Sequence, residues 1–143
     1  MITFEEALSV INSIPVRLTA VETGLDQAVG GVLAEDVFSD VEMPPFNKAA
    51  VDGYACRRLD LPGPFHLLGT IPAGSLPTLT IGPGQCSKIM TGAMVPEGAD
   101  TVIMVEHTEI LSDGRIMFIR DKTSTNIAWQ AEDVKAGQMV LPK

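Results

Sequence analysis

The sequence predicts an α+β protein that is mostly β, with an N-terminal helical arm followed by a compact β-rich domain of short, coiled strands. Apolar residues recur at helical spacing near the N-terminus, whereas short apolar runs punctuated by glycine, proline and aspartate fill the chain after Gly53. The 143 residues are 45% hydrophobic, which is enough for an ordinary aliphatic core.

We expect one boundary, near residues 39–46. The helical arm and a linking strand then occupy residues 1–43, and the β-rich domain occupies residues 44–143. The sequence has no internal repeat, low-complexity run or Gly/Ser-rich linker that would indicate another boundary.

The first helix is predicted to begin after Thr3. The sequence from Thr3 to Glu6 matches a capping box, in which each of these two side chains accepts a hydrogen bond from the backbone N–H of the other residue. An apolar stripe follows at helical spacing, and Pro15 ends the helix after about three turns. The stripe consists of Ala7, Leu8, Ile11 and Ile14.

A short helix is expected over residues 25–29, ending at Gly30-Gly31, and a strand over residues 32–38. Later strands are predicted where apolar runs lie between turn residues. They span residues 65–70, 86–90, 101–106, 109–111, 115–120 and 139–141. Asp113-Gly114 separates the fourth and fifth of these as a β-hairpin turn would.

Charge excludes some partners. Eighteen acidic and ten basic residues give a net charge of −8, which repels nucleic acid and anionic membranes. No secretory signal and no apolar run of membrane-spanning length is present, so we expect a cytoplasmic protein.

Cys56 and Cys86 lack metal-type spacing and are interpreted as small buried hydrophobes. His66 and His107 are interpreted as packed or exposed residues rather than metal ligands.

The segment from Pro44 to Ala55 is the first functional signal, because it presents a single carboxylate, Asp52. The two prolines restrict the backbone before it, and Gly53 permits a turn after it, so Asp52 is predicted to lie at a bend. Taken alone, Asp-Gly is also typical of a hairpin turn in which the aspartate bonds its own backbone.

The segment from Ile89 to Asp100 is the second signal. An expected strand runs into Thr91-Gly92, where a hydroxyl and backbone amides suit an oxyanion. A glycine-assisted turn between strands explains the same residues without a ligand.

The segment from Asn126 to Gly137 is the third. It carries the acidic pair Glu132-Asp133 and the only tryptophan, Trp129. A solvated turn with the tryptophan packed on the body is the alternative interpretation.

Together and in this order, the three segments resemble motifs of the MoeA family, the molybdopterin molybdenumtransferases, to which the E domain of gephyrin also belongs. The family patterns are close to P-P-F-[DN]-x-S-A-M-D-G-[YF]-A, I-M-T-G-A-x-V-P-x-G-A-D and N-I-R-x-x-G-E-D-V-x-x-G. The first two are specific, and the similarity extends over nearly all of the chain.

The resemblance implies an enzyme that inserts molybdate into adenylylated molybdopterin, releasing AMP, with a divalent cation such as Mg²⁺. By motif, Asp52, Thr91 and Asp133 match catalytic positions, and the two acids also match metal ligands. Carboxylates suit Mg²⁺, and the transfer would rest on positioning and electrostatics. The positions carried over as cofactor-binding are Lys48, Gly53, Gly92 and Asn126.

The chain departs from the family patterns at several positions. Ala49 replaces a serine, which removes a hydroxyl beside Asp52, and Ala131 replaces a glycine. Ala128 replaces an arginine, and losing such a charged contact costs about ten- to a hundredfold in affinity. Lys48 is a candidate for replacement charge.

In this family the corresponding region is followed by a larger α/β domain that holds the pterin-nucleotide and by a small β domain. We therefore expect these 143 residues to be inactive alone. The alternative is a non-catalytic assembly or binding module derived from the family. The implied partners are a second copy of the chain and the proteins of the pathway that synthesise and adenylylate molybdopterin.

In this family the N-terminal helix packs away from the β domain, so the apolar stripe of residues 7–14 would lack cover in a single chain. An exposed stripe favours association, and we expect a homodimer or a rearranged arm.

Overall fold

The computed structural model describes residues 2–16 and 18–143, so Met1 and Arg17 of the expected arm lie outside the description. The chain divides into two units. One unit is Met1–Asp36 with Pro142–Lys143, and the other is Val37–Leu141, which includes residues 37–43. No helix among the described residues combines the length and apolar character needed to cross a membrane.

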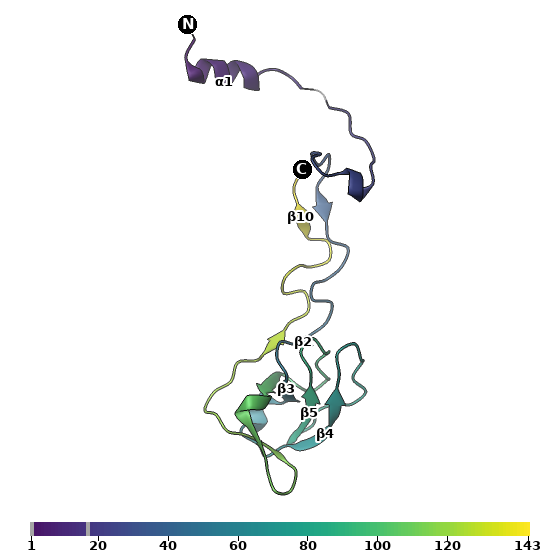
Figure 1. The fold of residues 1–143 in the computed structure, drawn as a ribbon, viewed down its shortest axis with the longest axis vertical. Helices are drawn as coiled ribbons and strands as arrows, with labels where there is room; N and C mark the ends of the chain where they lie inside the picture. Colours follow the sequence, from purple (N-terminus) through teal and green to yellow (C-terminus); the bar gives the residue numbers. More distant parts are fainter. Residues whose placement is uncertain (1, 17) are drawn as a thin grey trace. The chain divides into compact units, whose positions relative to one another are not determined.

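The first unit contains the predicted capped helix, α1 (Phe4–Asn12; Figure 1). The Thr3 hydroxyl accepts a hydrogen bond from the Glu6 N–H at 3.2 Å, and the Glu6 carboxylate accepts one from the Thr3 N–H at 2.8 Å. This confirms the capping box. The helix ends at Asn12, before Pro15, and none of its residues is buried.

The remaining expectations for the first part of the chain were less accurate. The second helix is a single 3₁₀ turn, η1 (Leu25–Gln27). The strand predicted over residues 32–38 is wrong for most of its length, because only β1 (Val37–Phe38) is extended and paired. Its partner β10 (Met139–Leu141) ends opposite Val37, so residues 32–36 have no strand beside them.

The second unit is built on a four-stranded sheet in the order β4-β5-β3-β6 (Figure 1). Its strands are β3 (Gly53–Cys56), β4 (His66–Ile71), β5 (Gln85–Ile89) and β6 (Thr101–Met104). Strand β3 runs antiparallel to both neighbours, and β4 is parallel to β5. The predicted strands at 65–70 and 86–90 are confirmed. The one at 101–106 ends early, at the 3₁₀ turn η3 (Val105–His107).

Short elements complete the second unit. The predicted hairpin is confirmed as β7 (Thr108–Ile110) and β8 (Ile116–Phe118), with Gly114 at φ +82° in the turn. The sequence pattern did not predict β3, the 3₁₀ turn η2 (Arg58–Asp60), or the paired two-residue strands β2 (Lys48–Ala49) and β9 (Ile127–Ala128). These pieces are too short to show a periodic pattern.

The sheet is covered on both faces by apolar residues. Alternation along β3 sends Ala55 into one cluster and Tyr54 and Cys56 into the other. The first cluster also contains Ala49, Ile71, Ile89, Ala93, Val102 and Ile127, and the second Phe65, Cys86, Ile103, Ile116 and Phe118. Both cysteines are fully buried, as predicted, and form no disulfide; burial raises the pKa of each thiol to about 12.

Glycine is needed at position 53 for a structural reason that the sequence did not indicate. It does not adopt a positive φ; it is the buried first residue of the central strand, opposite Ile89 and Met104. A Cβ on this residue would lie 2.1 Å from the Ile103 carbonyl oxygen. Only glycine allows the two backbones to approach this closely.

Replacing Gly53 with alanine is expected to destabilise the β-rich unit by about 3 kcal/mol, because the backbone of β6 must move to admit the methyl group. Chemical denaturation provides the measurement. The matched control is Gly69→Ala in β4, where the nearest atom to the new Cβ lies 3.9 Å away. A G53A free energy of unfolding within 0.5 kcal/mol of the G69A value would contradict this account.

Candidate functional site

Strand β2 brings the three sequence segments together. On one side it pairs antiparallel with β9 of the third segment, with Lys48 opposite Ala128 and Ala49 opposite Ile127. Toward the second segment, the Ala49 N–H donates to the Ala93 carbonyl at 2.9 Å, and the Ala49 carbonyl accepts from the Gly92 N–H at 2.8 Å. Segments far apart in sequence are therefore fixed by backbone hydrogen bonds.

Asp52 and Thr91 are in direct contact. Asp52 Oδ1 accepts two hydrogen bonds of 2.7 Å, one from the Thr91 N–H and one from the Thr91 hydroxyl. The Asp52 carbonyl also accepts from the Val105 N–H at 3.2 Å, which holds the backbone of this residue. Both side chains are exposed. The contact shows that Asp52 does not cap its own turn, so the local hairpin interpretation is wrong.

The contact with Thr91 controls the ionisation of Asp52. The backbone hydrogen bond from Thr91, then its hydroxyl hydrogen bond, lower the pKa of the Asp52 carboxyl below its usual value, with a smaller contribution from the positive charge of Lys88. Desolvation acts in the opposite direction and is outweighed. Asp52 is therefore a carboxylate at neutral pH, and the hydrogen bonds found among the described residues leave its Oδ2 without a donor.

Gly92 forms the turn that presents Thr91. A hydrogen bond from the Ala93 N–H to the Met90 carbonyl closes the turn, and Gly92 occupies its third position at φ +81°. No atom lies within 4 Å of a Cβ built on Gly92, so the surface beside it is open. The glycine-assisted turn is confirmed. Both Thr91 donors expected for an oxyanion are directed to Asp52, so an anion reaching Thr91 would have to compete for them.

Ala49 and Lys48 lie side by side in β2 but in different environments. Ala49 is 1% exposed and packs with Ala93 and Ile127, so its methyl group belongs to the core. The missing hydroxyl of the family serine is thus lost from a packed position rather than from the surface beside Asp52. Lys48 is half-buried and makes no ion pair with any described residue.

In the third segment, Asn126 and Asp133 are not found in contact with Asp52. The Asn126 side chain donates to the Val102 carbonyl at 2.7 Å, and its own carbonyl accepts from the Ala50 N–H at 2.9 Å. The Asp133 N–H donates to the Met43 carbonyl at 3.0 Å, and its side chain is exposed. Asn126 therefore ties the third segment to β6.

The loop after β9 contains a position of strained backbone. Ala131, where the family pattern has glycine, adopts φ +61°, in the left-handed region that costs a residue with a Cβ about 1 kcal/mol. Its N–H donates to the Pro44 carbonyl at 2.9 Å, which holds the residue in place. Nearby, the Trp129 N–H donates to Glu132 Oε2 at 2.8 Å, and the Trp129 side chain is 42% exposed.

Asn47 is a positioning residue that the sequence reasoning missed. Its side-chain oxygen accepts from the Gln130 N–H at 2.9 Å, and its carbonyl accepts from the Val95 N–H at 2.9 Å. Asn47 therefore joins all three segments through one residue. The signal was available, because Asn47 stands at the position where the first family pattern allows only aspartate or asparagine.

A metal could use only part of this arrangement. No group of three or more His, Cys, Asp or Glu side chains in residues 2–16 and 18–143 is placed to hold an ion. Mg²⁺ commonly takes one or two protein carboxylates and completes its shell with water and phosphate oxygens. The exposed Asp52 carboxylate, with Oδ2 free of donors, suits one such ligand.

The origin of the lowered Asp52 pKa gives a test. A group with a depressed folded-state pKa stabilises the fold above its ordinary pKa of 3.8, and this contribution is lost as pH falls through the lower folded value. In Thr91→Val the hydroxyl donor is gone, but the larger contribution from the backbone N–H remains. The pKa of Asp52 should therefore rise toward 3.8 without reaching it, as measured by carboxyl-carbon NMR titration.

Thr91→Ser is the matched control, because it keeps the hydroxyl and should leave the Asp52 pKa near that of the parent chain. An Asp52 pKa in Thr91→Val equal to that of the parent would refute the assigned cause.

Comparison with known proteins supports the family assignment suggested by the motifs. Residues 2–143 match the family model described as the MoeA N-terminal region, domains I and II. A molybdopterin molybdenumtransferase of Staphylococcus epidermidis is 37% identical over 99% of this chain and 36% of that protein. One from Bacillus subtilis is 35% identical over 83% of this chain and 30% of that protein.

Solved structures agree with the sequence comparison. Two crystal structures of the molybdopterin biosynthesis MoeA protein from Pyrococcus horikoshii superpose with TM-scores of 0.75 and 0.76, at 37% and 30% identity. The matched regions cover 85% and 99% of this chain, but only 34% and 38% of the two P. horikoshii chains. The chain therefore spans about a third of the length of the relatives it matches. It belongs to the MoeA family, through the N-terminal region of that family.

Proposed function

We propose that residues 1–143 supply one part of the site in which a molybdopterin molybdenumtransferase inserts molybdate into adenylylated molybdopterin during molybdenum cofactor biosynthesis. The contact between Asp52 and Thr91 carries this proposal. It joins the first two motifs, and it produces an exposed, ionised carboxylate in a fixed orientation beside an open surface.

The chemistry of such a site follows from charge. Asp52 is negative and molybdate is an anion, so the two repel unless a cation lies between them. Bound Mg²⁺ would supply that positive charge and bring substrate oxygens to the carboxylate. In this proposal Asp52 would hold the cation and Thr91 orients Asp52, while Asp133 is the exposed carboxylate that the third segment would contribute. None of these steps requires a covalent nucleophile.

The other proposed site residues have supporting roles. Lys48 is half-buried in β2 and is available to attract a substrate anion, in place of the arginine that Ala128 replaces. Asn126, Gly53 and Gly92 shape the backbone around the site, through a side-chain hydrogen bond, a close strand approach and a turn.

We further propose that these residues act only together with further regions of a longer protein, in the cytoplasm, and in sequence with the proteins that synthesise and adenylylate molybdopterin. The relatives are about three times as long as the matched region, which supports a site formed jointly by this region and others. On this proposal the 143-residue chain alone has no transferase activity.

A chimera tests the proposal. Residues 1–143 would replace the matching region of the S. epidermidis relative, and the chimera would be expressed in cells lacking their own molybdenumtransferase. The chimera should restore activity of a molybdenum enzyme, whereas the 143-residue chain alone should not. Asp52→Asn should lower the restored activity by at least about a hundredfold, as expected for losing a charged group that acts in the transition state.

Asp113→Asn is the matched control. Asp113 is also exposed, and hydrogen bonds from Arg115 also lower its pKa, but it lies in the β7–β8 hairpin. Full activity in the Asp52→Asn chimera, or an equal loss in Asp113→Asn, would remove Asp52 from the proposed site.

A non-catalytic assembly or binding module is the second candidate, and Ala128 favours it. This residue pairs with Lys48 beside the site, and its small side chain offers no charge to an anion. Ala49 adds little to this alternative, because its methyl group faces the core. In the same chimera, Ala128→Arg should raise turnover under the first proposal and leave it unchanged under the second.

We also propose that the protein is a homodimer through α1. Two residues of its apolar stripe, Leu8 and Ile11, are 46% and 63% exposed, and Ile14, which lies just beyond the end of α1, is 58% exposed. Sedimentation velocity should show a dimer of the 143-residue chain that dissociates in Ile11→Glu. Ser9→Glu, on another part of the same helix, should leave the dimer intact. The test concentration is about 100 μM, at which even a weak dimer forms. A parent chain that is monomeric at this concentration would contradict the dimer.

A further inference from the structure

A concave site lies in the β-rich unit, and none of its lining residues belongs to the three motifs. The cavity has a volume of about 480 Å³, within the range of roughly 300–1,000 Å³ that is typical for small-molecule sites. One wall comes from η2 and the residues after it. The other comes from the end of β8 and the loop over residues 120–123.

Two hydrogen bonds hold these walls together. The Phe118 N–H donates to the Pro62 carbonyl at 3.0 Å, and the Arg58 guanidinium donates through Nη1 to the Thr123 carbonyl at 3.1 Å. Arg58 is therefore anchored across the cavity by its own side chain. Leu61, Pro62 and Phe118 give part of the lining an apolar character.

The charge of this cavity is opposite to that of the chain. Three cationic side chains, Arg58, Arg120 and Lys122, line it with one carboxylate, Asp121, which gives a net formal charge of +2. The whole chain carries −8. Among the described residues the ion pairs are Arg57 with Asp60 and Arg115 with Asp113, and neither involves the three cations.

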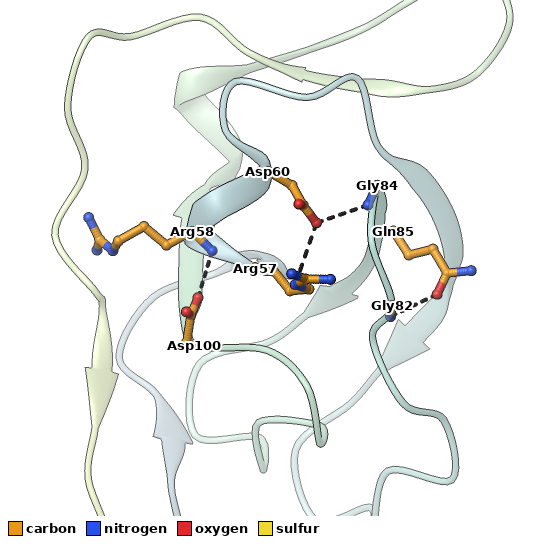
Figure 2. A network of polar contacts seen from close by, with 7 residues as sticks. All are labelled: Arg57, Arg58, Asp60, Gly82, Gly84, Gln85 and Asp100. Atoms are coloured by element: carbon orange, nitrogen blue, oxygen red, sulfur yellow. Dashed lines mark hydrogen bonds and ion pairs between the residues drawn. The ribbon is translucent and has the colours of Figure 1, made fainter.

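Asp60 and Asp100, the two acidic residues labelled near Arg58 in Figure 2, accept hydrogen bonds from groups other than its guanidinium. Asp60 Oδ2 accepts from the Gly84 N–H at 2.9 Å and lies 3.7 Å from Arg57 Nε. Asp100 Oδ1 accepts from the Arg58 backbone N–H at 2.6 Å. Figure 2 shows the Arg58 side chain extending away from both carboxylates, so these hydrogen bonds hold the backbone of η2 while the guanidinium projects elsewhere.

We propose that this cavity binds a small organic anion, with a phosphate or carboxylate group held by the three cations and a flat apolar body against Leu61 and Pro62. Arginine forks bind both oxyanions through paired hydrogen bonds, and a concave wall increases the attraction over that of an isolated surface charge. The apolar lining should give an organic anion a higher affinity than an inorganic ion.

NMR titration of the ¹⁵N-labelled 143-residue chain tests this proposal. The probes are phenyl phosphate, benzoate, inorganic phosphate and phenol. At least one of the two organic anions should give saturable shifts at the amides of residues 58–61 and 118–123. Inorganic phosphate and phenol should each bind at least about tenfold more weakly, because each lacks half of the interaction. The tighter of the two organic anions identifies the head group.

Arg120→Gln should weaken binding of that anion about tenfold, and Lys122→Gln provides a second variant should the first fail to fold. Lys135→Gln, which removes one positive charge elsewhere in the same unit, should have no comparable effect. The proposal is overturned by shifts that do not saturate at these residues, by phenol binding as tightly as the anions, or by equal weakening in Lys135→Gln.

Discussion

The backbone pairing of β2 is the constraint on which the candidate site depends. Lys48 and Ala49 pair with β9, and Ala49 also exchanges hydrogen bonds with Gly92 and Ala93. Each hydrogen bond contributes only about 1 kcal/mol, but together they close loops of more than forty residues. Ala49 can occupy this position because its side chain is small enough to be buried against Ala93 and Ile127. The site is thus positioned by main chain and core packing, not by a network of charges.

The exposure and fixed orientation of Asp52 follow from its place just after the end of β2. The chain leaves β2, bends, and enters β3 at Gly53, whose lack of a side chain lets β3 lie against β6. The bend leaves Asp52 at the surface, where the turn at Gly92 presents two donors from Thr91. A carboxylate fixed in this way stays charged at the surface, so it avoids most of the desolvation free energy that a buried charge costs.

How much the sequence predicted depended on the range of the interactions involved. The capping box, the 113–114 hairpin and the buried cysteines depend on neighbouring residues or on apolar character, and all are confirmed. Strands β2, β3 and β9 depend on pairing between distant segments, which leaves little local pattern, and they were missed. Gly53 shows the difficulty well: a turn and a close strand approach both require glycine, and sequence alone does not separate them. The Asp52–Thr91 contact could be expected only from the motifs, because 39 residues separate its partners.

The left-handed conformation of Ala131 has a consequence for how the family's motifs are recognised. The third pattern records glycine at this position, yet here alanine adopts a left-handed conformation, held by the hydrogen bond to the Pro44 carbonyl. In this chain the position is defined by a dihedral angle, which glycine would satisfy at lower cost. A search that demands the letter G would overlook chains such as this one, whereas a search for the φ value and its hydrogen-bond partner would retain them.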